Sequence, residues 1–240
     1  MGFFSKLFGK SARKENVPMV KSFDEMSEEE KLEEAILFIQ VNAEGDDGDP
    51  EYQFQYGVMF ATGKGPYGHG TFTKDFNQAV YWLNKSAAQG YLDAVCMLGR
   101  VYMDNGDSVT AVKYYTEAAE QGNEAACENL AMAYGLGDGV PEDKAEAHKW
   151  FLKAAELGSA FSQYIVGQNL FDGIGVEANP GEAMIWFEKA AKQGQPNAQF
   201  MMGQFFEIGR DDIETACQWY SKAAQQGLES ARERLRELQK

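Results

Sequence analysis

The chain has few of the residues that build disulfide frameworks and metal centres. Its 240 residues include three cysteines, Cys96, Cys127 and Cys217. These three cysteines match no disulfide framework and no zinc motif. Cys96 and Cys127 fall within expected helices, so we interpret them as packed thiols of a protein in a reducing, cytoplasmic compartment.

Catalytic patterns are missing as well. The chain has two histidines; His69 lies in a glycine-rich stretch, and His148 is expected on a solvated helix face. Neither has an acidic or cysteine neighbour at the spacing of a metal-ligand set or a catalytic triad. Two Gly-x-Gly pairs between residues 63 and 70 lack the strand and the Gly-Lys-Ser/Thr of a phosphate-binding loop. We therefore expect a protein that is not an enzyme and has no catalytic residue, metal or cofactor.

Long apolar runs and basic residues are both scarce. No apolar stretch is long enough for a signal peptide or a membrane span. The chain has 22 basic and 37 acidic residues, which gives a net charge of −15. An acidic body repels phosphates, so we expect no binding to nucleic acid.

The N-terminal segment departs from this acidic composition. Residues 1–21 hold five basic residues and one acidic residue, a net charge of +4, so the remainder carries −19. Apolar and basic side chains suited to anionic lipid are Phe3, Phe4, Lys6, Leu7, Phe8 and Lys10. Two interpretations stay open: a short interfacial membrane anchor formed by residues 1–14, or a tail that is disordered or packs on the rest of the chain.

Internal repetition is abundant. Five times an alanine is followed three residues later by an aromatic residue and eight residues after that by a glycine. The sets are Ala79/Trp82/Gly90, Ala111/Tyr114/Gly122, Ala147/Trp150/Gly158, Ala183/Trp186/Gly194 and Ala216/Trp219/Gly227. The glycines are 32, 36, 36 and 33 residues apart, a period typical of a helix-pair solenoid. Stacked neighbours in such a fold leave a long concave surface.

Each set predicts the second helix of a repeat. Four residues before the alanine stands a short polar residue that can cap the first turn. These caps are Asp75, Asp107, Asp143, Asn179 and Asp212. The glycine supplies the left-handed residue that ends the helix. A small residue also recurs in the preceding helix, the first helix of each repeat. These small residues are Gly57, Gly99, Ala131, Gly167 and Gly203.

Gly57 and Gly99 are 42 residues apart, whereas two of the other spacings are 36. The extra residues fall in the loop Gly63–Lys74. Insertions in solenoids lie in loops on one face, which is often used for binding.

Together these residues resemble the Sel1-like repeat, a branch of the tetratricopeptide superfamily, and the segment from Ala126 to Gly158 carries the motif most fully. The resemblance implies an all-α, right-handed α/α superhelical solenoid of about five helix-pair repeats with capping helices. Ser27 and Glu30 form a capping box that starts the first cap. The predicted parts are a tail and linker (1–22), an N-terminal cap (23–47), five repeats over 48–227 (48–90, 91–122, 123–158, 159–194 and 195–227) and a C-terminal cap (228–240).

The resemblance also implies that the first helix of each repeat lines the concave groove. Two positions per repeat should point into it: Gln55, Val58, Met97, Arg100, Asn129, Met132, Ile165, Gln168, Met201 and Gln204. Met97, Met132, Ile165 and Met201 would form an apolar strip there, and methionine surfaces adapt to varied partners. These residues could instead pack against the tail or a neighbouring helix.

Two function classes follow from these features. The first is a monomeric, non-enzymatic adaptor that binds a peptide or helix of a partner protein in the groove. The second is a peripheral membrane scaffold anchored through residues 1–14.

Overall fold

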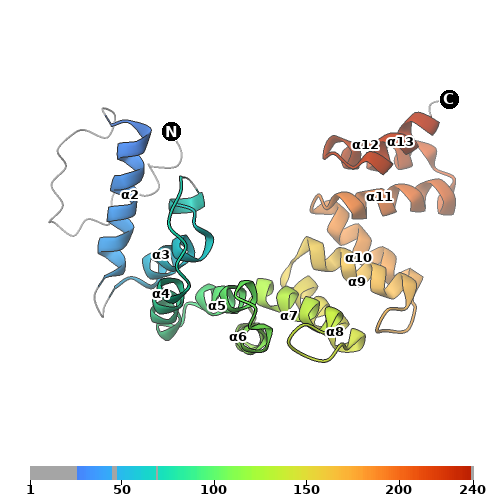
Figure 1. Ribbon diagram of the computed structural model, residues 1–240. Coiled ribbons are helices and arrows are strands. Elements are labelled where there is room, and N and C mark those ends of the chain that lie inside the picture. Colours follow the sequence, from blue (N-terminus) through green and yellow to red (C-terminus); the bar gives the residue numbers. More distant parts are fainter. Residues whose placement is uncertain (1–25, 45–47, 69, 239–240) are drawn as a thin grey trace. The chain divides into compact units, whose positions relative to one another are not determined.

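The computed structural model describes residues 26–44, 48–68 and 70–238 (Figure 1). Within these residues the fold consists of twelve α-helices and no strand, which confirms the predicted all-α fold of five helix-pair repeats with flanking helices. The membrane-contact residues predicted between Phe3 and Lys10 lie outside the described residues.

The helices follow the repeats in order. The flanking helices are α2 (Glu28–Ala43) and α13 (Glu229–Leu238). The five pairs are α3 (Pro50–Thr62) with α4 (Phe76–Ala88), α5 (Leu92–Asp104) with α6 (Ser108–Glu120), α7 (Glu124–Leu136) with α8 (Lys144–Leu157), α9 (Ala160–Asp172) with α10 (Pro180–Lys192), and α11 (Pro196–Gln204) with α12 (Ile213–Gln225). The π-helical turn η3 (Phe205–Gly209) continues α11, and the 3₁₀ turn η2 (Pro66–Gly68) lies between α3 and α4.

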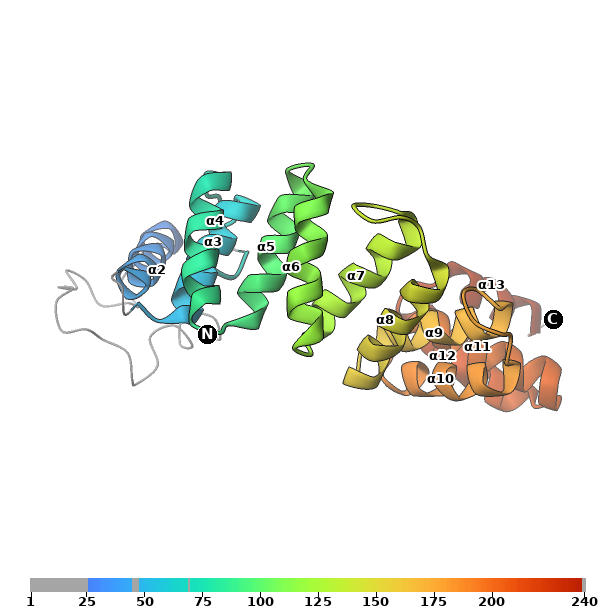
Figure 2. The same cartoon turned by 90° about the horizontal axis from the view of Figure 1, so that it is seen from below.

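The chain forms two compact units, and each is described by itself. Unit 1 ends at Glu117, and unit 2 runs from Ala118 to the C-terminus. In unit 1, α3 and α4 form one antiparallel pair and α5 and α6 the next, as Figure 2 shows. Unit 2 contains the pairs of repeats 3 to 5 and α13.

The predicted helix ends are present. Each of the five predicted caps accepts a hydrogen bond from a backbone amide two or three residues later. Ser27 and Glu30 form the expected capping box at the start of α2. The glycines that follow the second helices have φ between 84° and 120°, a region in which a side chain is strained. Local sequence therefore fixes where the helices begin and end.

The small residues of the first helices give the pairs their close packing. An added Cβ on Gly167 would lie 2.7 Å from the ring of Phe187, and one on Gly203 would lie 2.5 Å from the ring of Tyr220. The large side chain that packs against each small residue belongs to the residue that follows the repeated aromatic of the second helix. All five of these residues are buried: Leu83, Tyr115, Phe151, Phe187 and Tyr220. Three of the five predicted aromatics are only half-buried, namely Tyr114, Trp150 and Trp219. The principal core position is thus one residue later than the spacing predicts.

Neighbouring repeats are joined by glutamine pairs, each made of one buried and one exposed residue. In unit 2, Gln163 donates to the carbonyl of Ala155 near the end of α8, at 3.1 Å. Gln193 donates to Gln163 at 2.9 Å and to the carbonyl of Gly158 at 2.9 Å. Gln199 and Gln226 repeat the arrangement one repeat later, and Gln53 and Gln89 form the equivalent pair in unit 1. Each pair supplies side-chain donors to carbonyls at or just after the end of the preceding helix.

The insertion Gly63–Lys74 packs against the N-terminal helix. Pro66 is fully buried, and an added Cβ on Gly70 would lie 2.2 Å from the side chain of Leu32 in α2. The ring of Phe72 contacts that of Phe60, with centroids 4.9 Å apart. The inner side of the insertion therefore completes the core between α2 and α3.

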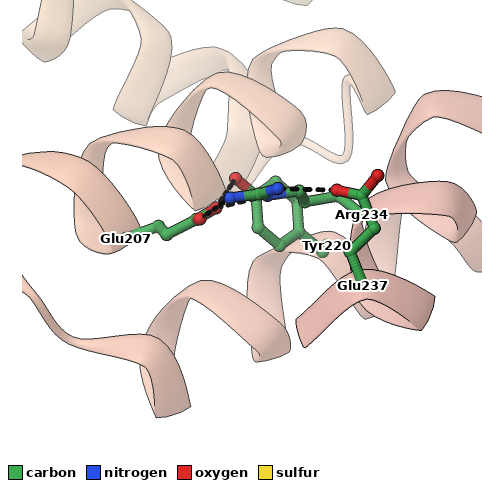
Figure 3. Close-up of polar contacts among 4 residues, drawn as sticks. All are labelled: Glu207, Tyr220, Arg234 and Glu237. Carbon is green, nitrogen blue, oxygen red and sulfur yellow. Dashed lines mark hydrogen bonds and ion pairs between the residues drawn. The ribbon is translucent and has the colours of Figure 1, made fainter. Parts of the chain in front are cut away.

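The C-terminal helix is held by a polar network (Figure 3). The carboxylate of Glu207, on η3, accepts hydrogen bonds from Tyr220 at 2.8 Å and from Nε of Arg234 at 3.0 Å. A second Arg234 nitrogen also pairs with Glu207, and Arg234 donates to Glu237 at 2.6 Å. The hydrogen bonds from Arg234 lower the pKa of Glu207 against the effect of burial. The side chain of Glu207 is 8% exposed and that of Arg234 is 39% exposed, so a buried carboxylate is paired with a partly exposed cation.

His148 is not on a solvated face, and that expectation was wrong. It is buried in α8, and its Nδ1 lies 3.3 Å from the side-chain amide nitrogen of Asn169 in α9. Burial lowers the pKa of His148, and the charge of Glu182 opposes this shift. His148 is a buried polar residue at the contact between the third and fourth repeats.

Candidate protein-binding face

In unit 1 the predicted groove residues belong largely to the core. Val58 on α3 and Met97 on α5 are half-buried and pack against the cluster that contains Leu83 and Leu98. Gln55 is also half-buried, and its side-chain amide lies 3.4 Å from the carboxylate of Glu51. The first helices of unit 1 therefore offer little exposed apolar surface.

Arg100 is the exposed member of the unit 1 set. It forms an ion pair with Asp104 at 3.9 Å, one turn further along α5. Both side chains are well exposed, so the pair is screened by water and contributes little to stability.

In unit 2 one of the predicted residues is exposed and the other five are half-buried. Met132 on α7 is 39% exposed. Ile165 on α9 and Met201 on α11 are half-buried and pack against the core cluster of repeats 3 to 5. The polar members Asn129, Gln168 and Gln204 are half-buried. The candidate site therefore lies on the first helices of unit 2.

The structure adds exposed apolar residues that the two-position rule missed. Leu136, four residues after Met132, is 78% exposed, and Ile208, four residues after Gln204, is 79% exposed. Phe161, four residues before Ile165, is also exposed. Residues four apart on a helix share a face, so the i, i+4 spacing was a signal for all three. We call the set Met132, Leu136, Phe161, Ile165, Met201 and Ile208 the unit 2 strip.

A carboxylate interrupts the unit 2 strip. Asp172, at the end of α9, is exposed and occupies the repeat position that Leu136 and Ile208 hold in the neighbouring repeats. Tyr164 lies two turns earlier; burial raises its pKa, a hydrogen bond with Gln168 lowers it, and the charge of Asp172 raises it again. The face thus combines apolar side chains with a negative charge.

Other kinds of site were sought in the part of the chain that the structure describes. Within it, no three histidine, cysteine or acidic side chains are grouped so that they could hold a metal ion. None of the described helices is both long enough and apolar enough to cross a membrane.

Two solved structures share both fold and sequence with this chain. The crystal structure of c5321, a protective antigen present in uropathogenic Escherichia coli strains and displaying an SLR fold, has 32% identity and a TM-score of 0.71; the match covers 85% of this chain and 43% of that one. A Sel1 repeat protein from Oxalobacter formigenes has 31% identity and a TM-score of 0.69, over 85% of this chain and 59% of that one. The chain therefore spans about half the length of these two proteins.

No curated protein matches the chain. A family model, in contrast, agrees with the two solved structures. The Sel1 repeat model matches five consecutive segments: residues 50–91, 92–123, 124–159, 160–195 and 196–228. These segments cover well over half of the sequence, and the chain belongs to the Sel1 repeat family.

Proposed function

We propose that this protein is a non-enzymatic adaptor whose unit 2 strip binds a helix or peptide of a partner protein. Sel1 repeat proteins generally mediate protein–protein interactions and are typically scaffolds without enzymatic activity. The observation that carries the proposal is the exposure of large apolar side chains on the first helices of repeats 3 to 5. Exposed apolar patches mark interaction sites, and the proposal is that these side chains form one.

The spacing of the strip suits an amphipathic partner. Met132 and Leu136 lie one turn apart on α7, and Phe161 and Ile165 lie one turn apart on α9. A helix that presents apolar residues every three or four positions could place them against such a face.

The acidic charge of unit 2 favours a partner segment that has basic residues beside its apolar ones. Residues 118–240 hold eleven basic and nineteen acidic residues, and Asp172 lies within the face itself. We therefore expect a partner segment that carries lysine or arginine beside its apolar residues, because complementary charge favours encounter and specificity.

The test is affinity capture from lysate of the source cell with matched variants. Leu136→Glu with Ile208→Glu places two charges on the strip without removing buried volume, because both side chains are more than three quarters exposed. The control is Leu157→Glu with Ile185→Glu, which makes the same charge change on the second helices of unit 2 at side chains 46% and 54% exposed.

We expect one protein to be captured by the wild type and the control but not by the strip variant, and Asp172→Lys to weaken its capture. Equal capture by the strip variant and the control, with helicity unchanged in both, would contradict the proposal.

A further inference from the structure

The outer side of the insertion between α3 and α4 holds a second candidate site, separate from the unit 2 strip. A cavity of about 340 Å³ lies there, lined by Phe60, Thr71, Phe72 and Thr73. This volume is at the lower end of the range of small-ligand pockets. Two of the lining residues are aromatic and two carry hydroxyl groups, so the lining is both apolar and able to donate hydrogen bonds.

Two lysines flank this lining. Lys64 pairs with Thr71 across an antiparallel bridge, and side chains directly opposite each other in such a pair lie on the same face. Lys74 follows Thr73, and its stem lies over Gly63, where an added Cβ would be 2.8 Å from its Cγ. Both lysines are exposed. The two ammonium groups are therefore carried by the same hairpin as the threonines.

Neither Lys64 nor Lys74 forms an ion pair within residues 26–44, 48–68 and 70–238. Other basic residues of unit 1 do have such partners, as Lys31 has in Glu28 and Arg100 in Asp104. Residues 26–117 hold six basic and fifteen acidic residues. Lys64 and Lys74 thus place two cations on one hairpin of a unit whose charges are mostly acidic.

We propose that this cavity binds an acidic peptide segment of a partner protein, in which an aromatic or aliphatic side chain stands next to a carboxylate. The side chain would lie against the rings of Phe60 and Phe72, which are in edge contact with each other. The carboxylate would accept hydrogen bonds from the threonine hydroxyls and pair with the two ammonium groups.

The acidity of the unit does not oppose this. At physiological ionic strength charges are screened beyond about 8 Å, so the adjacent lysines determine which ligand charge is preferred. The lysine pair thereby distinguishes this site from the acidic face of unit 2.

The probes are three acetylated and amidated tetrapeptides: Gly-Phe-Asp-Glu, its uncharged counterpart Gly-Phe-Asn-Gln, and Gly-Ala-Asp-Glu, which lacks the ring. Each is titrated into the ¹⁵N-labelled full chain while the amide signals of Thr71 and Thr73 are followed. We expect Gly-Phe-Asp-Glu to shift these signals and to bind about fivefold more tightly than Gly-Phe-Asn-Gln, the size expected for two exposed charge pairs. It should also bind more tightly than Gly-Ala-Asp-Glu, because only the phenylalanine ring can lie against Phe60 and Phe72.

Variants assign the preference to the lysines. Lys64→Gln with Lys74→Gln should reduce the affinity for Gly-Phe-Asp-Glu to that for Gly-Phe-Asn-Gln. The control Lys113→Gln removes an exposed lysine of α6 and should leave the affinity unchanged.

Three results would overturn the proposal. They are equal binding of the charged and uncharged peptides, equal shifts produced by inorganic phosphate alone, and no shift of Thr71 or Thr73 at a peptide concentration of about 10 mM, where even a millimolar complex is largely formed. None of these results bears on the unit 2 strip, so the two proposals succeed or fail separately.

Discussion

The close approach of paired helices can be tested by adding one methyl group at Gly167. In Gly167→Ala the new Cβ would lie 2.7 Å from two carbons of the Phe187 ring. Phe187 is fully buried between α9 and its neighbours, so its ring cannot move into solvent. The helices or the ring must shift, and neighbouring contacts in the core must loosen.

The expected magnitude is a balance of two effects. Overpacking a well-filled core typically costs about 1–3 kcal/mol. Replacing glycine by alanine inside a helix gains about 1 kcal/mol. We therefore expect Gly167→Ala to lower the free energy of unfolding by about 1 kcal/mol, because the steric cost exceeds the gain in helix propensity.

Gly135→Ala is the matched control. Gly135 also lies in a first helix of unit 2, but the nearest atom to its added Cβ is the Cβ of Ala147 at 3.7 Å, an ordinary van der Waals contact. This variant should gain about 0.5 kcal/mol, less than the full helix-interior value because the site is near the end of α7. Urea unfolding followed by circular dichroism measures both changes.

The repeat itself shows how a methyl group can be accommodated. In the third repeat Ala131 stands where Gly167 stands in the fourth, and its partner Phe151 is 9% exposed, whereas Phe187 is 0% exposed. If Gly167→Ala proves as stable as Gly135→Ala, the helices adjust without strain and the role assigned to the small residues is wrong.

Three further predictions concern buried polar groups. Gln163→Leu should destabilise the chain by about 1–2 kcal/mol in urea unfolding, because it removes two hydrogen bonds, the one to the carbonyl of Ala155 and the one from Gln193; a loss no larger than that of an exposed Gln→Leu change would contradict this. Because the pKa of His148 is lowered in the folded state, the unfolded state binds more protons just below the ordinary value of about 6.5, so stability should fall as pH falls from 7.5 to 5. This loss should be smaller in His148→Gln, and identical pH profiles would refute it. Arg234→Met should leave the buried carboxylate of Glu207 without its cation and speed amide hydrogen exchange across Glu229–Leu238, whereas the control Arg236→Met removes only an exposed ion pair of 3.8 Å with Glu229; equal exchange in both variants would argue against the network in Figure 3.

Helix ends and repeat positions could be predicted from the sequence because their causes are local. A cap such as Asp143 acts on amides two and three residues away. The partner of Gly167 was harder to identify, since Trp186 and Phe187 are adjacent and both large. In the structure it is the phenylalanine ring that faces the glycine.

Contacts between distant residues could not be predicted in this way. Glu207 and Arg234 are 27 residues apart, and they meet because a π-helical turn redirects the end of the α11 segment. The burial of His148 depends on Asn169 in the next repeat. For the candidate face, the sequence indicated Met97, Met132 and Met201 alike, and only the structure shows that Met132 is exposed whereas Met97 and Met201 are half-buried against core clusters.

In unit 2 the contacts between successive repeats, here called joints, share the same accepting carbonyl near the end of a second helix. The side chain that donates to this carbonyl varies. Gln163 and Gln199 each donate to a carbonyl eight residues earlier, near the end of the preceding second helix. At the equivalent position of the third repeat stands Cys127, whose thiol is a weak donor at 3.7 Å from the carbonyl of Ala119. Lys153 donates to that same carbonyl at 2.6 Å.

The last joint follows the same rule with yet another residue. Arg232 of α13 lies eight residues after Ala224 and donates to its carbonyl at 3.2 Å. Each of these four carbonyls also accepts a hydrogen bond from the backbone amide of the glycine three residues later, so the next helix adds a second donor from a side chain. Three kinds of side chain fill this role at four successive joints: glutamine at two, cysteine together with Lys153 at one, and arginine at one. α13 therefore makes the same joint as the first helices of the repeats before it, and what the joints share is a side-chain donor and not the identity of glutamine.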